Sequence, residues 1–203
     1  MHNCLVGSEM CIRDRTPYDD VHIGHARTFV NFDVIVKFFK FLGFKVRYVR
    51  NITDVDDKII NRAKEEGIPA LDLSKKYIKE MHDDFSSLGI ESPDVEPKVS
   101  DHIDEIISMI QSLEEKGYAY RKKESDVFFD VQKFKEYGKL SNRSLEQLTA
   151  AERTIVDLNK KHKADFVLWK VDTDGITWPS PWGKGRPGWH IECSAMSIKS
   201  VSY

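Results

Sequence analysis

The chain has 203 residues, of which 40% are hydrophobic and 32% are charged, and its formal net charge is −2. This length suits one domain, with or without an inserted segment, and excludes a large multidomain enzyme. The composition excludes a disordered or fibrous protein, no apolar run approaches the ~20 residues of a membrane helix, and the balanced charge excludes a global basic field for nucleic acid.

The two ends of the chain differ in character from the rest. Residues 1–15 have neither helical nor strand periodicity and resemble translated sequencing-adaptor sequence, as do residues 200–203, so we exclude both from fold reasoning. The three cysteines, Cys4, Cys11 and Cys193, are widely spaced and follow no secretory signal. This pattern favours a reducing, cytoplasmic compartment over a disulfide framework.

The first regular element is a helix followed by a strand. Apolar residues recur four apart from Ala26 to Phe38, and further apolar positions widen the arc, which predicts a buried helix that ends at Gly43. Residues 44–48 then alternate between apolar and basic, which predicts a strand. A helix that leads into a strand across one glycine is the second half of a βαβ unit.

A polar run at 51–57 follows that strand, at the end where open α/β sheets place their ligands. Three helices are predicted after it: one that ends near Gly67, an amphipathic one over 77–88 closed by Gly89, and one capped by Ser100 that ends at Gly117.

The alternation of helix and strand stops at residue 118. The runs within 118–131 predict a β-hairpin, and we expect a short helix near 144–152 and a polar, lysine-bearing loop at 157–163. Residues 166–169 predict a short buried strand, and the Pro/Gly/Trp-rich run at 178–188 predicts a rigid loop that leads into an extended 189–193.

We therefore predict an α/β protein with a Rossmann-like parallel sheet that is incomplete and carries an inserted, partly β connective segment. The expected division is a leader at 1–15, the first half of the sheet domain at 16–117, the connective insertion at 118–165, a return to the sheet domain at 166–199, and a tail at 200–203.

The first candidate site is the sequence His22-Ile23-Gly24-His25, where a loop becomes a helix. The N–H groups and the positive dipole end of the helix favour an anion there, and two imidazoles can donate to phosphate oxygens as charge develops in nucleotidyl transfer. A glycine lets a base or ribose approach the backbone. Four residues also match by chance, so two partly exposed histidines at a helix start are the alternative.

The context of this motif carries a family resemblance. The stretch TPYDDVHIGHART at 16–28 resembles the first signature of the class I aminoacyl-tRNA synthetases. The runs NITDVDDKII at 51–60 and PGWHIECSAM at 187–196 are similar to motifs of the cysteinyl branch. Three motifs in this order identify residues 16–199 as similar to the N-terminal part of the catalytic domain of the cysteinyl-tRNA synthetases.

The resemblance implies a cysteine–tRNA ligase, in which ATP activates L-cysteine to cysteinyl-adenylate and the cysteinyl group passes to tRNA(Cys). It also implies ATP as substrate, a Zn²⁺ ion in the intact protein, a cytoplasmic location and no membrane, and it favours a monomer without fixing the oligomeric state. It assigns ATP binding to Tyr18, His22, Gly24 and His25, catalysis to His22 and His25, cysteine binding to Thr53 and Trp189, and metal binding to Cys193.

The zinc has a chemical reason in this family, because a substrate thiolate is a soft ligand that a serine hydroxyl cannot imitate. An isolated Cys193 would otherwise be interpreted as a small buried residue. For His190 we expect a structural hydrogen bond, since adjacent strand residues point to opposite faces. For the basic run at 160–163 we expect a solvated loop rather than a tRNA contact.

The sequence departs from the family at both ends. The register of the family's first zinc-binding cysteine falls on Arg13, and the chain stops before the remaining zinc ligands and the lysine-rich loop that grips the triphosphate. A zinc site needs three or four protein ligands, so we expect these residues alone neither to hold zinc tightly nor to activate cysteine.

Three alternatives remain. The cysteine ligase of mycothiol synthesis shares the histidine signature and the zinc chemistry, but we expect its second motif to depart from residues 57–60. A small adenylyltransferase also shares the histidine signature, but it lacks the long insertion. The third is a non-catalytic module that binds nucleotide or tRNA without preference for cysteine.

Overall fold

The computed structural model describes residues 4–6, 9–11, 16–122, 125–142, 144, 145, 147 and 158–201. The chain forms two compact units: the first holds residues 3–102 and 196–203, and the second holds residues 103–195. Among the described helices, none is both long enough and apolar enough to cross a membrane. The sequence-based division at residues 118 and 166 stays a prediction.

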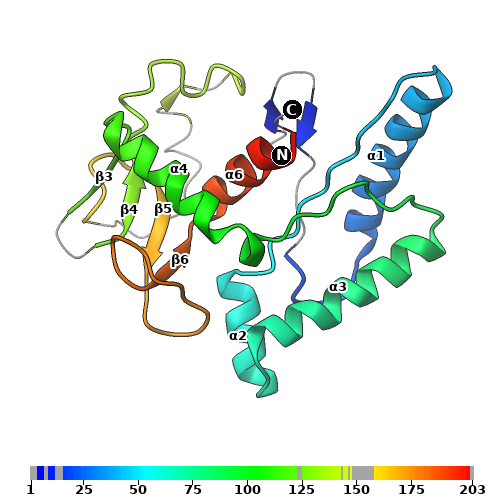
Figure 1. Ribbon diagram of the computed structural model, residues 1–203, viewed down its shortest axis with the longest axis horizontal. Coiled ribbons are helices and arrows are strands. Elements are labelled where there is room, and N and C mark those ends of the chain that lie inside the picture. The colour runs from blue at the N-terminus through cyan, green and yellow to red at the C-terminus, as the bar shows by residue number, and fades with distance from the viewer. Residues whose placement is uncertain are drawn as a thin grey trace. The chain divides into compact units, whose positions relative to one another are not determined.

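The first unit consists mainly of helices (Figure 1). They are α1 (Ile23–Phe41), α2 (Asp57–Glu66), α3 (Ala70–Ser87) and the 3₁₀ turn η1 (Val99–Asp101). The three predicted helices in this region are confirmed, and α2 ends as expected at Gly67, which has the left-handed φ of +66° that favours glycine. In the leader, β1 (Cys4–Val6) and β2 (Glu9–Cys11) pair as an antiparallel hairpin that periodicity did not predict.

Two extended segments of the first unit pair in parallel. Val49 bridges to Val95 and Ile52 to Lys98, and the N–H of Arg50 donates to the carbonyl of Val95 at 3.0 Å. The chain between them passes through α2 and α3, which is the crossover that parallel strands require. The strand predicted at 44–48 is wrong in position, because the pairing begins where Asp94 accepts the N–H of Tyr48 and runs on through residue 52.

Helix α1 is less buried than its sequence predicts. Only Phe29, Asp33 and Val36 are buried. These three residues recur at helical spacing and face α3 and the 48–52 segment, where Phe29 packs on Phe85 with ring centroids 4.6 Å apart. The prediction of a buried helix with a wide apolar arc is therefore wrong in extent, because one stripe of α1 is buried.

The second unit is built on an antiparallel sheet (Figure 1). Its elements are α4 (Ile103–Glu115), β3 (Ala119–Arg121), β4 (Val127–Phe129), β5 (Phe166–Val171), β6 (Gly185–Pro187) and the first turns of α6 (Trp189–Val201), with strand order β3-β4-β5-β6. The predicted hairpin and the predicted strand at 166–169 are confirmed, and both belong to this sheet. Gly185 must be a glycine, since a Cβ there would lie 2.1 Å from the carbonyl oxygen of Lys170.

Two local predictions are wrong. Ser100 does not cap a helix: its hydroxyl donates to the carboxylate of Asp54, and α4 begins three residues later. Residues 189–193 are the start of helix α6 rather than an extended segment. Most of the short helix predicted near 144–152 lies outside the described residues.

Candidate active site

The histidine signature forms the N-terminus of α1. His22 is the N-cap residue in an extended conformation, and its Nδ1 accepts the backbone N–H of Gly24 at 3.1 Å. The Nδ1 of His25 accepts the backbone N–H of His22 at 3.4 Å, which completes a capping box made of two imidazoles. The local sequence therefore satisfies two N–H groups that a helix start would otherwise leave without partners.

The two imidazole rings stack on each other. Their centroids lie 3.6 Å apart with an interplanar angle of 21°. A Cβ on Gly24 would lie 2.9 Å from Cε1 and 3.0 Å from Nδ1 of His22, so any side chain at this position would displace the ring. The lack of a side chain at Gly24 thus leaves the space that the His22 ring occupies. The sequence pattern did not reveal this reason for a glycine.

The hydrogen bonds also fix which ring nitrogen carries the proton. A neutral imidazole has one donor and one acceptor nitrogen. Since Nδ1 accepts in both His22 and His25, Nε2 is the donor in both neutral rings. The first turn of α1 contains no acidic residue, so the positive end of the helix dipole is not neutralised there. The arrangement presents two N–H donors and a positive helix end to an anion.

Tyr18 joins the loop before α1 to the neighbouring helices. Its ring packs against the apolar cluster of Ile59, Ala63, Leu73 and Tyr77, and Nζ of Lys58 lies 5.3 Å from the ring centroid. Tyr18 thereby fixes the approach of the signature loop to α2 and α3, while its assignment to ATP binding stays a prediction.

Residues 51–55 of the polar run are buried, and the side chains of the run have different partners. Thr53 is 0% exposed, so its predicted place in a cysteine pocket stays a prediction. Asp54 accepts both the backbone N–H and the hydroxyl of Ser100, and the Asp54 carbonyl accepts the Ser74 hydroxyl at 2.9 Å. Asp54 thus ties the carboxyl ends of the two parallel segments to α3.

Sequence reasoning missed this function of Asp54, because the three aspartates of the run look alike. Their burial distinguishes them: Asp54 is buried, Asp56 caps α2 by accepting the N–H of Lys58, and Asp57 is exposed.

Trp189 and Cys193 belong to the part of α6 in the second unit. They are four apart on a helix and so lie on one face, with Trp189 40% exposed and the Cys193 thiol half-buried. His190 contacts Phe166 edge to face at 4.7 Å. The strand geometry assumed for His190 is wrong, because residues 189–193 are helical, and its predicted structural hydrogen bond stays a prediction.

Cys193 is the one predicted metal ligand of the chain. Among the described residues, no three His, Cys, Asp or Glu side chains lie close enough together to hold a metal ion. Cys193 is a suitable single ligand, but these residues do not complete a zinc site, and no chemical step is derived through one.

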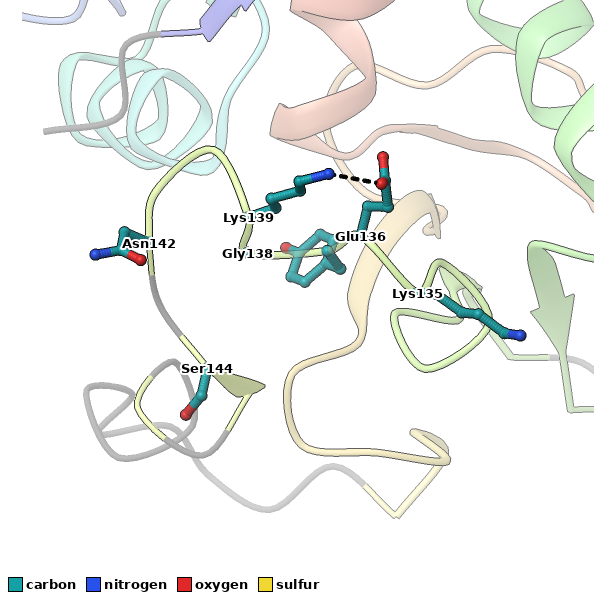
Figure 2. A pocket seen from close by; sticks show the side chains of 7 residues that line it. Lys135, Glu136, Gly138, Lys139, Asn142 and Ser144 are labelled. Carbon is teal, nitrogen blue, oxygen red and sulfur yellow. Dashed lines mark hydrogen bonds and ion pairs between the residues drawn. The ribbon is translucent and has the colours of Figure 1, made fainter.

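The structure brings together His22, Gly24 and His25, and it places Tyr18 and Thr53 in the same unit. A separate, open depression of about 480 Å³ lies in the second unit (Figure 2). Its rim is polar, and Lys139 donates to Glu136 across 2.8 Å. The depression contains none of the predicted site residues; it is lined by Lys135, Glu136, Tyr137, Gly138, Lys139, Asn142 and Ser144.

Comparison with known proteins agrees with the resemblance. Residues 4–203 match the family model described as the tRNA synthetases class I (C) catalytic domain. The chain is 55% identical to a cysteine–tRNA ligase of Idiomarina loihiensis over 187 residues, which cover 92% of this chain and 41% of that protein. It is 53% identical to a cysteine–tRNA ligase of Pasteurella multocida over 202 residues, 99% of this chain and 44% of that protein.

A solved structure shares the fold. The methionyl-tRNA synthetase of Mycobacterium tuberculosis in complex with methionyl-adenylate superposes with a TM-score of 0.69 at 14% identity, covering 94% of this chain and 46% of that one. The class I synthetase fold is therefore confirmed. The chain spans less than half the length of these relatives.

Proposed function

Because this chain belongs to the family of class I (C) tRNA synthetase catalytic domains, we propose that it supplies the ATP-binding part of a cysteine–tRNA ligase. The observation that carries the proposal is the pair of stacked imidazoles at the start of α1, with Nε2 of each ring as a donor. The relatives named cysteine–tRNA ligase support cysteine as the amino acid that is activated.

In the proposed reaction, a carboxylate oxygen of L-cysteine attacks the α-phosphorus of ATP, and the bond to the bridging oxygen of pyrophosphate breaks. Negative charge increases on the phosphate oxygens during this step. The Nε2–H groups of His22 and His25 and the N-terminus of α1 donate to that charge without rearrangement, because the capping bonds already fix both rings. Gly24 contributes by leaving room for the His22 ring.

The remaining binding roles are proposed from the chain's membership of the family. Thr53 and Trp189 bind the cysteine substrate, and Tyr18 borders the ATP site. Cys193 would be one ligand of a zinc ion in the intact protein, and that ion would supply soft coordination for a thiolate. The cysteinyl group passes to tRNA(Cys). We also propose a cytoplasmic location and a monomeric state.

Isothermal titration calorimetry with ATP tests the nucleotide site. His22→Asn is the sharpest variant, because asparagine keeps an N-cap acceptor and removes the imidazole donor. We expect the dissociation constant for ATP to rise about tenfold, which corresponds to about 1.4 kcal/mol. His82→Asn is the matched control, since His82 lies on α3 and pairs with Glu96. Equal affinity for ATP in the wild type and His22→Asn would reject the assignment.

The same titration with cysteinyl- and seryl-adenylate analogues tests the amino acid when the chain is extended by the part of the Pasteurella multocida relative outside the match, because the described residues alone do not complete a zinc site. A cysteine–tRNA ligase site should prefer the cysteinyl analogue. A module that only binds nucleotide should take both analogues with the same affinity, and that result would favour the non-catalytic alternative.

A further inference from the structure

A charged side chain lies in the interior of the first unit. Arg50 is 3% exposed, and its Nε donates to the carboxylate of Glu96 at 2.7 Å. Arg50 Nη1 is also buried, and it has no hydrogen-bond partner among the described residues. A buried ion pair with a donor left over rarely stabilises a protein more than apolar side chains of the same volume would. Stability alone therefore does not account for an arginine at this position.

The guanidinium of Arg50 lies against two aromatic rings from different helices. Its Cζ lies 5.4 Å from the ring centroid of Phe29 in α1 and 5.2 Å from that of Phe85 in α3. The two rings also contact each other, with their centroids 4.6 Å apart. A guanidinium is planar and stacks on aromatic faces in few orientations, unlike the flexible chain of a lysine or methionine. Arg50 therefore determines where Phe29 lies relative to α3 and the 48–52 segment.

Phe29 connects this arrangement to the histidine signature. It lies four residues after His25, which places both side chains on one face of α1, about one turn apart. Phe29 is also the first buried residue of α1. A shift of the Phe29 ring therefore moves the His25 ring, and the stacking of His25 on His22 transmits the shift to the second donor.

The opposite end of α1 is held by a contact of a different kind. Lys40 pairs with Glu91 at 2.8 Å, and both side chains are 44% exposed. Exposed ion pairs contribute little to stability, because two long side chains must be held in one geometry. The orientation of the signature therefore depends more on the buried contact at Phe29 than on this ion pair.

We propose that Arg50 is a positioning residue for ATP binding, which acts through Phe29 on the two imidazole donors of the signature. Glu96 holds the guanidinium in its plane. The other carboxylate oxygen of Glu96 contacts the exposed ring of His82, and asparagine in the His82→Asn control keeps a donor there. Arg50 is buried and does not itself contact the nucleotide. The inference rests on the proposed function, since it concerns the same ATP site.

Isothermal titration calorimetry with ATP and thermal denaturation of the same variants test the proposal. Arg50→Met combined with Glu96→Met removes both charges and keeps the buried volume. We expect an unchanged or higher melting temperature and a dissociation constant for ATP that is about fivefold higher, because hydrogen bonds weaken steeply when a donor is displaced. Arg50→Lys keeps the charge without the plane, so ATP affinity should fall about as much, and it serves if the double variant does not fold.

The matched control removes the exposed ion pair of the same helix. Lys40→Gln combined with Glu91→Gln should leave both the melting temperature and the affinity for ATP close to those of the wild type.

A double-mutant cycle with His22→Asn separates positioning from a general loss of structure. Effects of distant substitutions normally add in free energy, but Arg50 acts only through the signature. The combined loss of affinity should therefore be smaller than the product of the two separate losses. Two results would overturn the proposal: folded Arg50 variants that bind ATP like the wild type, or losses that multiply fully with that of His22→Asn. Wild-type affinity of His22→Asn itself would reject the proposed function and this inference together.

Discussion

The two units of the chain bury their aromatic side chains to very different extents. In the second unit, Trp169 and Phe128 are 0% exposed between the strands of the antiparallel sheet. In the first unit, the phenylalanines in the last turns of α1 remain largely in contact with solvent. Both regions are equally rich in aromatic residues, so composition does not cause the difference.

The cause lies in how many strands each unit pairs. In the second unit, β3, β4, β5 and β6 form a four-stranded antiparallel sheet, and the aromatic side chains of its central strands are buried. Among the described residues of the first unit, 48–52 pair in parallel with 94–99 across two helices. Sequence separation does not distinguish the two units, because the pairing of Val127 with Trp169 joins positions almost as far apart as the pairing of Val49 with Val95.

The largest expected effect compares one buried and one exposed aromatic residue. Trp169→Ala should lower the free energy of unfolding by about 3–5 kcal/mol, because it leaves a large cavity on the face of β5 that Trp182 contacts. Phe38→Ala should change it by less than about 0.5 kcal/mol, because the ring is already exposed. Urea denaturation followed by circular dichroism measures both, and similar losses from the two substitutions would contradict the comparison.

The second prediction concerns the polar contacts that hold the 158–165 loop on the sheet. The Tyr120 hydroxyl donates to Asp165 at 2.7 Å and accepts the backbone N–H of Lys161 at 2.6 Å. Tyr120→Phe leaves the buried Asp165 carboxylate short of a donor and should cost about 1–3 kcal/mol in urea denaturation.

Burial, aided by the hydrogen bond to Asp165, raises the pKa of Tyr120 above its ordinary value of 10. The stability from this group is therefore present below pH 10 and declines as the pH rises above 10 toward the higher folded-state pKa. Tyr118→Phe is the control, since Tyr118 contacts Phe129 through its ring, which phenylalanine retains. An alkaline stability profile that is the same in wild type and Tyr120→Phe would disprove this account.

The third prediction compares the effect of Gly24→Ala on thermal stability with its effect on ATP binding. Gly24→Ala should raise the helix propensity of α1 by about 0.5–1 kcal/mol while its Cβ displaces the His22 ring. We expect an unchanged or higher melting temperature and ATP affinity that falls about tenfold. A variant that binds ATP as well as wild type would show that the seated position of His22 is unnecessary.

The smallest effect is an acid dependence in the second unit. The backbone N–H of Asp174 and the Arg186 guanidinium lower the pKa of Asp172, so its stabilisation is present above the ordinary pKa of about 3.9 and is lost as the pH falls through the lower folded value. The ion pair is partly exposed, so the effect should stay below about 1 kcal/mol. Asp172→Asn should flatten the stability profile between pH 5 and pH 2. A profile parallel to wild type would refute this.

The sequence predicted the features that depend on neighbouring residues. Helix α2 was predicted to end near Gly67, where it ends, and the hairpin at 119–129 was predicted from two short apolar runs separated by a charged turn. The motif at 22–25 was predicted at a helix start, where the structure places it.

Features that depend on distant partners were missed. Serine is a common helix cap, but the Ser100 hydroxyl donates its hydrogen bond to the carboxylate of Asp54, which lies 46 residues earlier in the chain. The pattern of α1 shows which of its residues are apolar, but burial of a side chain also requires something to pack on it. Residues 189–193 form a helix, although the preceding loop suggested an extended segment. The backbone of Gly188 packs directly on β5 and donates its N–H to the carbonyl of Leu168, and the chain changes direction there.

The most direct test of the account is cysteine-dependent ATP–pyrophosphate exchange. The assay uses the chain alone and the chain extended by the part of the Pasteurella multocida relative that lies outside the match. We expect no exchange from the chain alone, exchange from the extended chain only when L-cysteine is present, and its loss with His22→Asn. A folded extended chain without exchange, or exchange that is indifferent to cysteine or to His22, would contradict the claim that α1 begins at the adenylation site of a cysteine–tRNA ligase.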